Sequence, residues 1–168
     1  MKSTLEVINK MQASGVISRY AIGEAVGAIY YLEAITTQDI DIFVSIKSPP
    51  GKLIATLDPI YEYLKASGYH FKGQHLQIEG WPVEFLPAED PLCSDALLSA
   101  IEVEMDGTKT WVMSQEHLIA IAIKTGRPKD FLRLQQFVSL GTFDEEYLRE
   151  IVNKHKLTSK WEEFKRTA

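Results

Sequence analysis

The hydrophobic period of this 168-residue chain changes near residue 112, and that change constrains the fold more than any other feature. Before it, short β-branched and aromatic runs such as 40–44 alternate with apolar stripes at helical spacing, which is typical of strands alternating with helices. From Ser114 onward the apolar stripes have helical spacing. The pattern predicts an α/β core over 1–112 (α+β in some schemes), with a small mixed sheet flanked by helices. A C-terminal helical subdomain packed on this core is expected over 113–168.

Turn and capping signals divide these two parts into elements. The expected elements are a helix ending before Gly15, a strand at 20–22, a helix at 25–32, a strand at 40–44, a helix from 53 to Gly68, short strands over 69–86, a hairpin over 101–112 and helices from 114 onward. Asp106-Gly107 is a strong hairpin signal because both residues tolerate positive φ. Thr142 with Glu145 has capping-box spacing and predicts the start of a further helix.

Composition excludes several classes of protein. Hydrophobic residues make up 45% of the chain and charged residues 24%, which is close to the globular average and argues against disorder or collagen-like repeats. The net charge of −5 argues against a general nucleic-acid-binding protein. One cysteine, Cys93, allows neither an intrachain disulfide nor a cysteine-based zinc cluster. Without a long apolar run or a signal-peptide core, we expect a cytoplasmic protein that does not contact membranes.

Three acids stand out because they lie in otherwise apolar strands. Asp39 and Asp41 are separated by one residue, so their side chains share a face about 6.6 Å apart at Cα. Glu84 is the one acid in the strand-like run 81–86, where a carboxylate is an unusual choice for structure alone. Neighbouring carboxylates repel unless a cation lies between them, and Mg²⁺ prefers oxygen ligands. The alternatives are a solvated edge strand or a three-carboxylate metal site.

Two further segments carry candidate binding groups. Gly23-Glu24 follows a strand and opens a helix, where free backbone N–H groups can face an anion. Residues 124–133 contain four bases and one acid, although the chain as a whole is acidic. This basic segment is either a solvated helix junction or a phosphate-binding segment. The four histidines lack ligand spacing and are expected at the surface or at helix ends.

Taken in order, these motifs resemble the minimal nucleotidyltransferases of the DNA polymerase beta superfamily. Members carry a Gly-Gly or Gly-Ser turn opening a helix, an Asp-x-Asp strand and a third acid on a later strand. Here these correspond to Gly23-Glu24, Asp39-Ile40-Asp41 and Glu84. Segments 114–120 and 124–130 are similar to the C-terminal helical signature of AbiEii-like abortive-infection toxins. The likeness spans roughly residues 20–161.

The resemblance implies a nucleotidyltransferase fold and transfer of a nucleoside monophosphate from an NTP to an acceptor hydroxyl. Asp39, Asp41 and Glu84 would be catalytic and would hold Mg²⁺ or Mn²⁺. The implied nucleotide-binding residues are Gly23, Glu24, Thr37, Lys124, Lys129 and Asp130, with Lys124 and Lys129 reaching phosphates and Asp130 orienting one lysine by an ion pair. The acceptor stays open between tRNA, a protein hydroxyl and a small molecule. A toxin role with an antitoxin-like protein partner is also implied.

Glu24 departs from the family pattern, which has a small residue after the first glycine. A carboxylate beside a triphosphate repels it unless the side chain points away or helps to bind metal. The alternative is therefore a non-catalytic binding or regulatory module with a nucleotidyltransferase fold. A purely structural interaction protein is a third option, and it leaves the three acids unexplained.

Overall fold

The computed structural model describes residues 1–32, 39–46, 56–72 and 75–167. The helices in these ranges are α1 (Lys2–Ala13), α2 (Glu24–Ile29), α3 (Asp58–Ala66), α4 (Pro91–Leu98), α5 (Gln115–Thr125), α6 (Pro128–Leu140), α7 (Glu145–Lys154) and α8 (Thr158–Thr167). The strands are β1 (Arg19–Ile22), β2 (Ile40–Ser45), β3 (His70–Lys72), β4 (His75–Ile78), β5 (Trp81–Pro87), β6 (Ile101–Met105) and β7 (Thr108–Val112). None of the helices described is long and apolar enough to cross a membrane.

The strands form one mixed sheet in the order β3-β4-β5-β2-β1-β7-β6. Strand β2 runs antiparallel to β1 and parallel to β5, and β1 runs parallel to β7. The centre of the sheet therefore combines strands that are far apart in the sequence. This architecture confirms the predicted mixed sheet with flanking helices.

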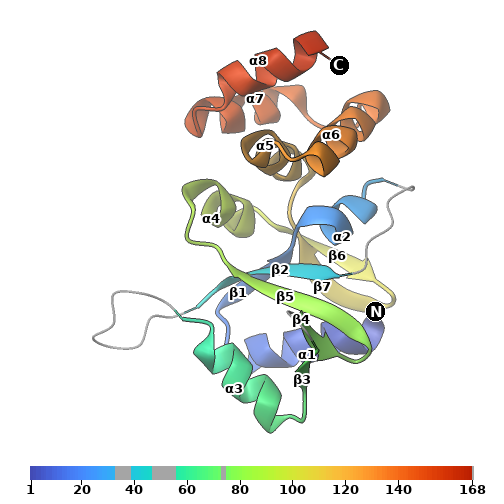
Figure 1. Ribbon diagram of the computed structural model, residues 1–168, viewed down its shortest axis with the longest axis vertical. Coiled ribbons are helices and arrows are strands. Elements are labelled where there is room, and N and C mark those ends of the chain that lie inside the picture. Colours follow the sequence, from blue (N-terminus) through green and yellow to red (C-terminus); the bar gives the residue numbers. More distant parts are fainter. Residues whose placement is uncertain (33–38, 47–55, 73–74, 168) are drawn as a thin grey trace.

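Helices cover both faces of the sheet, as Figure 1 shows. Helices α1 and α3 lie on one face, α2 and α4 lie on the other, and α5–α8 stack beyond α2 and α4. Strand β2 divides its side chains between the two cores: Ile42 and Val44 join the cluster under α1 and α3, whereas Phe43 joins the cluster with α4 and α5. By the same alternation, Asp41 lies on the side of α2 and α5.

The hairpin prediction is confirmed, because Asp106 and Gly107 join β6 to β7 with φ angles of 50° and 72°. Glu79 and Gly80 make a second such turn between β4 and β5, with φ angles of 52° and 86°. Two consecutive residues with positive φ match the right-handed twist of the flanking strands. The short strands expected on either side of Gly80 are therefore present.

Helices α4 and α7 begin at residues that the sequence did not predict as helix starts. Helix α4 was not expected; its N-cap is Asp90, whose carboxylate accepts hydrogen bonds from the N–H groups of Leu92 and Cys93. Helix α7 begins after Asp144 rather than at Thr142, because the Asp144 carboxylate accepts from the next free N–H groups.

A polar junction joins α4 to the helical layer above it. The Asp95 carboxylate lies 2.8 Å from Lys154 Nζ and 2.9 Å from His155 Nε2 of the α7 end. His117, the third residue of α5, lies near a helix end as expected but is fully buried, with Nε2 3.7 Å from the same carboxylate. Burial lowers the pKa of His117, although Asp95 opposes this effect. Burial therefore favours the neutral form of this ring.

Candidate active site

The predicted acids gather where β1 ends and β2 begins. Asp41 and Glu84 are register partners in the parallel pair of β2 and β5, so their side chains leave the same face of the sheet. Gly23 follows β1 directly, and its N–H donates a 3.0 Å hydrogen bond to the carbonyl oxygen of Asp41. The structure thus brings the Gly23 turn beside the strand that carries Asp41 and opposite Glu84.

The turn at Gly23 needs glycine for space. A Cβ atom at this position would lie 2.5 Å from Cε2 of Phe43 and 3.2 Å from Sδ of Met113. Both neighbours are buried core residues, so they cannot move aside without disturbing the packing. The φ angle of Gly23 is −118°, which any residue can adopt. Close approach of the turn to the sheet is therefore the constraint.

Asp39, Asp41 and Glu84 form what we call the acidic edge, and Asp41 lies at its centre. Its pKa rises to about 7, first because the carboxyl is half-buried and then because Glu24, Asp39 and Glu84 place negative charge around it. Lys129, at the start of α6, partly opposes this effect. Four acidic side chains and one lysine thus act on each other across α2, β2, β5 and α6.

The donor chemistry at this edge suits a hard divalent cation. Asp39 lies just before β2, and its Oδ2 is 3.6 Å from Nε2 of His75. Within the parts of the chain that the structure describes, no three His, Cys, Asp or Glu side chains are already arranged as a metal site. The carboxylate oxygens of Asp41 and its register partner Glu84 are nevertheless the kind of ligand that Mg²⁺ and Mn²⁺ favour. A bound cation would relieve the repulsion that raises the pKa of Asp41.

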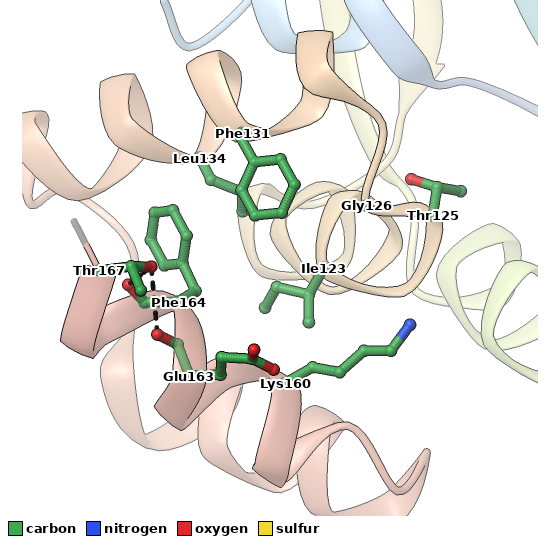
Figure 2. Close-up of a pocket in the computed structure, with 9 residues that line it drawn as sticks. All are labelled: Ile123, Thr125, Gly126, Phe131, Leu134, Lys160, Glu163, Phe164 and Thr167. Atoms are coloured by element: carbon green, nitrogen blue, oxygen red, sulfur yellow. Dashed lines mark hydrogen bonds between the residues drawn. The ribbon is translucent and has the colours of Figure 1, made fainter.

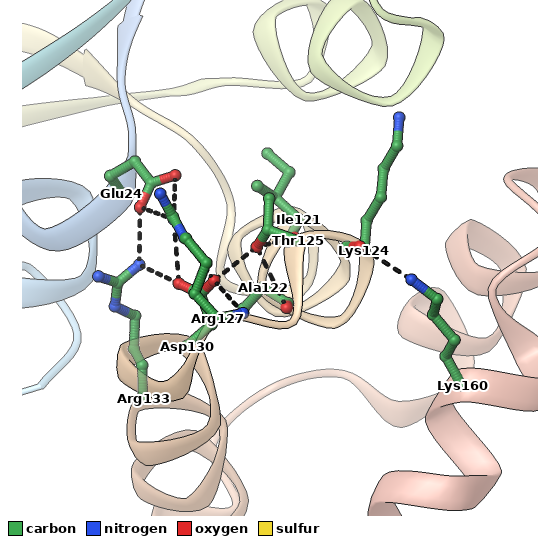
Figure 3. A network of polar contacts seen from close by, with 9 residues as sticks. All are labelled: Glu24, Ile121, Ala122, Lys124, Thr125, Arg127, Asp130, Arg133 and Lys160. Atoms are coloured by element: carbon green, nitrogen blue, oxygen red, sulfur yellow. Dashed lines mark hydrogen bonds and ion pairs between the residues drawn. The ribbon is translucent and has the colours of Figure 1, made fainter.

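Glu24 turns toward α6 (Figure 3). Its two carboxylate oxygens accept hydrogen bonds of 2.8 and 2.7 Å from Nη2 of Arg127, and Oε2 lies 3.2 Å from Nη1 of Arg133. Glu24 also has a φ angle of 45°, in the left-handed region. Its negative charge is therefore compensated by two guanidinium groups, although it still acts on Asp41.

Asp130 does not orient a lysine, which corrects the expectation from the sequence. The fully buried carboxylate accepts bonds from Nε of Arg127 at 2.7 Å, from the Arg127 N–H at 3.0 Å and from Oγ1 of Thr125 at 2.7 Å. Burial alone would raise the pKa of Asp130, but these hydrogen bonds lower it overall. A buried carboxylate needs several donors, and a guanidinium fork supplies them better than a single ammonium.

The two predicted phosphate-binding lysines act on different acids. Lys124 forms an ion pair with Asp90 at the start of α4, and its carbonyl oxygen accepts a 2.9 Å hydrogen bond from Nζ of Lys160. Lys129 instead acts on Asp41. The structure therefore places Lys129, rather than Lys124, with the acidic edge. Thr37 lies outside the described residues.

Arg127 and Arg133 are the site residues that the sequence did not single out. Both belong to the basic segment 124–133, whose four bases exceed its one acid. Their partner Glu24 lies 103 and 109 residues earlier in the chain, so no local pattern joins them. The usable signal was the surplus of positive charge in this segment.

A cavity of about 470 Å³ lies among α5, α6 and α8 (Figure 2). Phe131 and Phe164 contribute stacked rings to it, with centroids 6.3 Å apart. Among the proposed active-site residues that the structure describes, none lines this cavity. The acidic edge is thus a separate feature of the molecule.

Two solved structures are similar to this chain over nearly its whole length. An antigenic nucleotidyltransferase-like protein from Paracoccidioides brasiliensis superposes with a TM-score of 0.61 at 16% identity, covering 95% of this chain and 90% of that chain. The antibiotic-resistance factor ANT(2'')-Ia superposes with a TM-score of 0.55 at 13% identity, covering 98% of this chain and 94% of that chain. The chain has a nucleotidyltransferase-like fold.

At the level of sequence, no family model and no curated protein matches the chain. The likeness is one of fold, and it agrees with the architecture that the ordered motifs predict. In this nucleotidyltransferase-like fold, the Gly23 turn, Asp41 and Glu84 meet at one edge of the central strands.

Proposed function

We propose that this protein is a metal-dependent nucleotidyltransferase that moves a nucleoside monophosphate from an NTP to an acceptor hydroxyl, with pyrophosphate leaving. The observation that carries the proposal is the environment of Asp41. Its carboxyl is half-buried opposite its register partner Glu84, and burial, followed by the negative charge of Glu24, Asp39 and Glu84, raises its pKa to about 7. Such an arrangement is costly unless a cation or a reaction makes use of it.

Each residue at the acidic edge has a role in this proposal. Asp39, Asp41 and Glu84 would hold Mg²⁺ or Mn²⁺, which when bound neutralises charge on the triphosphate. Glu84 is exposed beside Asp41 and would accept the proton of the acceptor hydroxyl. Gly23 lets the turn lie close to the sheet, and the N–H groups that follow it would bind phosphates. Lys129 adds positive charge on the α6 side.

The acceptor and the biological setting are finer hypotheses. A tRNA, a protein hydroxyl and a small molecule all remain candidate acceptors, and we expect the protein to meet its NTP in the cytoplasm. The AbiEii-like toxin role, with an antitoxin-like partner, depends on segments 114–120 and 124–130 alone.

The alternative is a non-catalytic binding or regulatory module with the same fold. Two observations favour it. Glu24 places a carboxylate where the resembling family has a small residue, and the acids in the described ranges are not pre-arranged around a metal. Against it, Asp41 and Glu84 retain the face and register that the reaction needs.

The test is calorimetric titration of each NTP with and without Mg²⁺, followed by an assay for pyrophosphate release. The wild type is compared with Asp41→Asn and with the control Asp58→Asn, which removes an exposed carboxylate from α3 on the other face of the sheet. We expect Mg²⁺-dependent binding and turnover in the wild type and the control, and their loss in Asp41→Asn. Equal turnover in Asp41→Asn, or no binding of any NTP by the wild type, would reject the proposal.

A further inference from the structure

The carboxylate of Glu24 occupies a site built from two arginines. Arg127 Nη2 donates to both of its oxygens, and Arg133 Nη1 approaches Oε2 at 3.2 Å (Figure 3). The side chains of Glu24 and Arg133 are 11% and 10% exposed, whereas that of Arg127 is 41% exposed. An anion arriving from solvent can therefore reach the guanidinium of Arg127 before Glu24 leaves.

The two arginines do not depend on Glu24 alone for their positions. Nε of Arg127 donates to the fully buried Asp130 at 2.7 Å, and Nη1 of Arg133 lies 3.8 Å from the same carboxylate. Two arginines and two acids make this cluster neutral, and it carries one net positive charge once Glu24 turns away. What remains is a pre-positioned pair of guanidinium groups, the donors that match phosphate oxygens.

Glu24 is also placed to respond to a ligand at the acidic edge. It directly follows Gly23, whose N–H donates a 3.0 Å hydrogen bond to the carbonyl oxygen of Asp41, and its φ of 45° is a backbone conformation that favours glycine. A side chain kept in an unfavourable conformation points to a role for that side chain. Glu24 thus connects the Asp41 edge to the arginine pair.

We propose that Arg127 and Arg133 bind one phosphate group of the NTP, and that Glu24 fills this site until the phosphate displaces it. This inference rests on the proposed function, because it assigns further binding residues to the same substrate. A phosphate group carries more negative charge than a carboxylate and offers three oxygens, so it competes well for two guanidinium forks. Glu24 then acts as an internal competitor that weakens binding of polyphosphates.

Titration with inorganic triphosphate in the absence of metal tests the anion site directly. We expect Glu24→Gln, which removes the charge at unchanged length, to bind triphosphate roughly fivefold to tenfold more tightly than the wild type. Glu24→Gln combined with Arg133→Gln should lose this gain. The control Glu102→Gln removes a carboxylate from an exposed ion pair with Lys109 and should bind like the wild type.

A second measurement covers the case in which the double variant does not fold. Arginine side-chain nitrogen resonances of the wild type, followed by NMR during the same titration, should shift for Arg127 and Arg133 more than for the exposed Arg149. Equal triphosphate affinity of Glu24→Gln and wild type, or unchanged Arg127 and Arg133 resonances at saturation, would overturn the inference.

Failure of this inference and failure of the proposed function give different results. If Glu24→Gln binds triphosphate no more tightly, yet Mg²⁺-dependent NTP turnover is lost in Asp41→Asn, the function stands and the arginine site is wrong. If Glu24→Gln binds triphosphate more tightly but the wild type has no NTP turnover, the anion site stands and the transferase function is wrong.

Discussion

At the scale of single residues, Asp41 links the stability of the protein to pH. Its ordinary pKa of 3.8 rises to about 7 in the folded chain, so the folded state binds more protons than the unfolded state between these values. The free energy of unfolding therefore falls as pH rises through this window, and the penalty is complete above pH 7. The acidic edge thus destabilises the metal-free protein at neutral pH.

Replacing Asp41 by asparagine should remove this penalty. In the presence of a chelator at pH 8, we expect Asp41→Asn to be about 1–2 kcal/mol more stable than the wild type, less than the full pKa difference implies because the carboxyl is half-exposed. The gain should disappear near pH 4. Urea unfolding across this range measures it, with Asp58→Asn as the control. If Asp41→Asn and the wild type have the same free energy of unfolding at every pH, the Asp41 carboxylate does not destabilise the folded protein.

The sequence predicted part of this site for a simple reason. Strand periodicity places Asp39 and Asp41 on one face, and one acid in an apolar strand marks Glu84. The ion-pair partners of Glu24 and Lys124 could not be predicted from the sequence. Their partners come from elements dozens of residues away, and local spacing says nothing about which way a long side chain turns.

At the scale of secondary structure elements, Asp130 organises the start of α6. It accepts the Arg127 N–H and also receives Thr125 Oγ1 from the end of α5, so one buried carboxylate joins two helices. Nε of Arg127 donates a further hydrogen bond to the same carboxylate. The buried Asp130 carboxylate therefore holds the turn between α5 and α6 in place, and this turn sets the position of Arg127.

Asp130→Asn should destabilise the protein by about 2–4 kcal/mol, because Nε of Arg127 and Oγ1 of Thr125 lose the charged acceptor that they share at a buried position. Hydrogen exchange should rise first in the opening turn of α6. Asp144→Asn is the matched control: Asp144 caps α7 at an exposed position, where asparagine caps equally well. Equal losses in the two variants would mean that Asp130 acts only as a cap.

Some elements were easier to predict than others, and their chemistry explains why. The hairpin of β6 and β7 depends on Asp106-Gly107, a signal contained in two adjacent residues. Helix α4 was missed because it is short and lies in an acid-rich stretch without a clear apolar stripe. Its start depends on Asp90 followed by Pro91, which is a sound N-terminal signal once a helix is suspected.

At the scale of the whole molecule, Asp95 ties the sheet-covering layer to the helical layer. Burial raises the pKa of this carboxyl, but hydrogen bonds from His155 and Lys154 outweigh it and lower the pKa to about 2. The ionised form is thus favoured in the folded state. The ionised Asp95 therefore adds to the free energy of unfolding above its ordinary pKa near 4, and this stabilisation is lost as pH falls toward 2.

Asp95→Asn should reduce the free energy of unfolding at pH 7 by about 1–2 kcal/mol, since charged hydrogen bonds to two partners are weakened. The difference from the wild type should shrink between pH 4 and pH 2. Urea unfolding monitored by far-ultraviolet circular dichroism measures both effects. Glu102→Gln, in an exposed ion pair, serves as control and should change stability by less than about 0.5 kcal/mol. A pH-independent loss in Asp95→Asn would contradict the ionic origin of the junction.

The acids of the acidic edge are synthesised before the arginines that lie near them in the folded protein. Glu24, Asp41 and Glu84 leave the ribosome before Arg127 and Arg133, and β1 gains its β7 neighbour only when residues 108–112 emerge. At roughly 5–20 residues per second, the interval between Asp41 and Arg133 lasts roughly 5–20 s. During that interval the acids are present without the two arginines that compensate the charge of Glu24 in the folded protein. The translation rate and the cations present during synthesis are therefore expected to affect how the nascent chain folds.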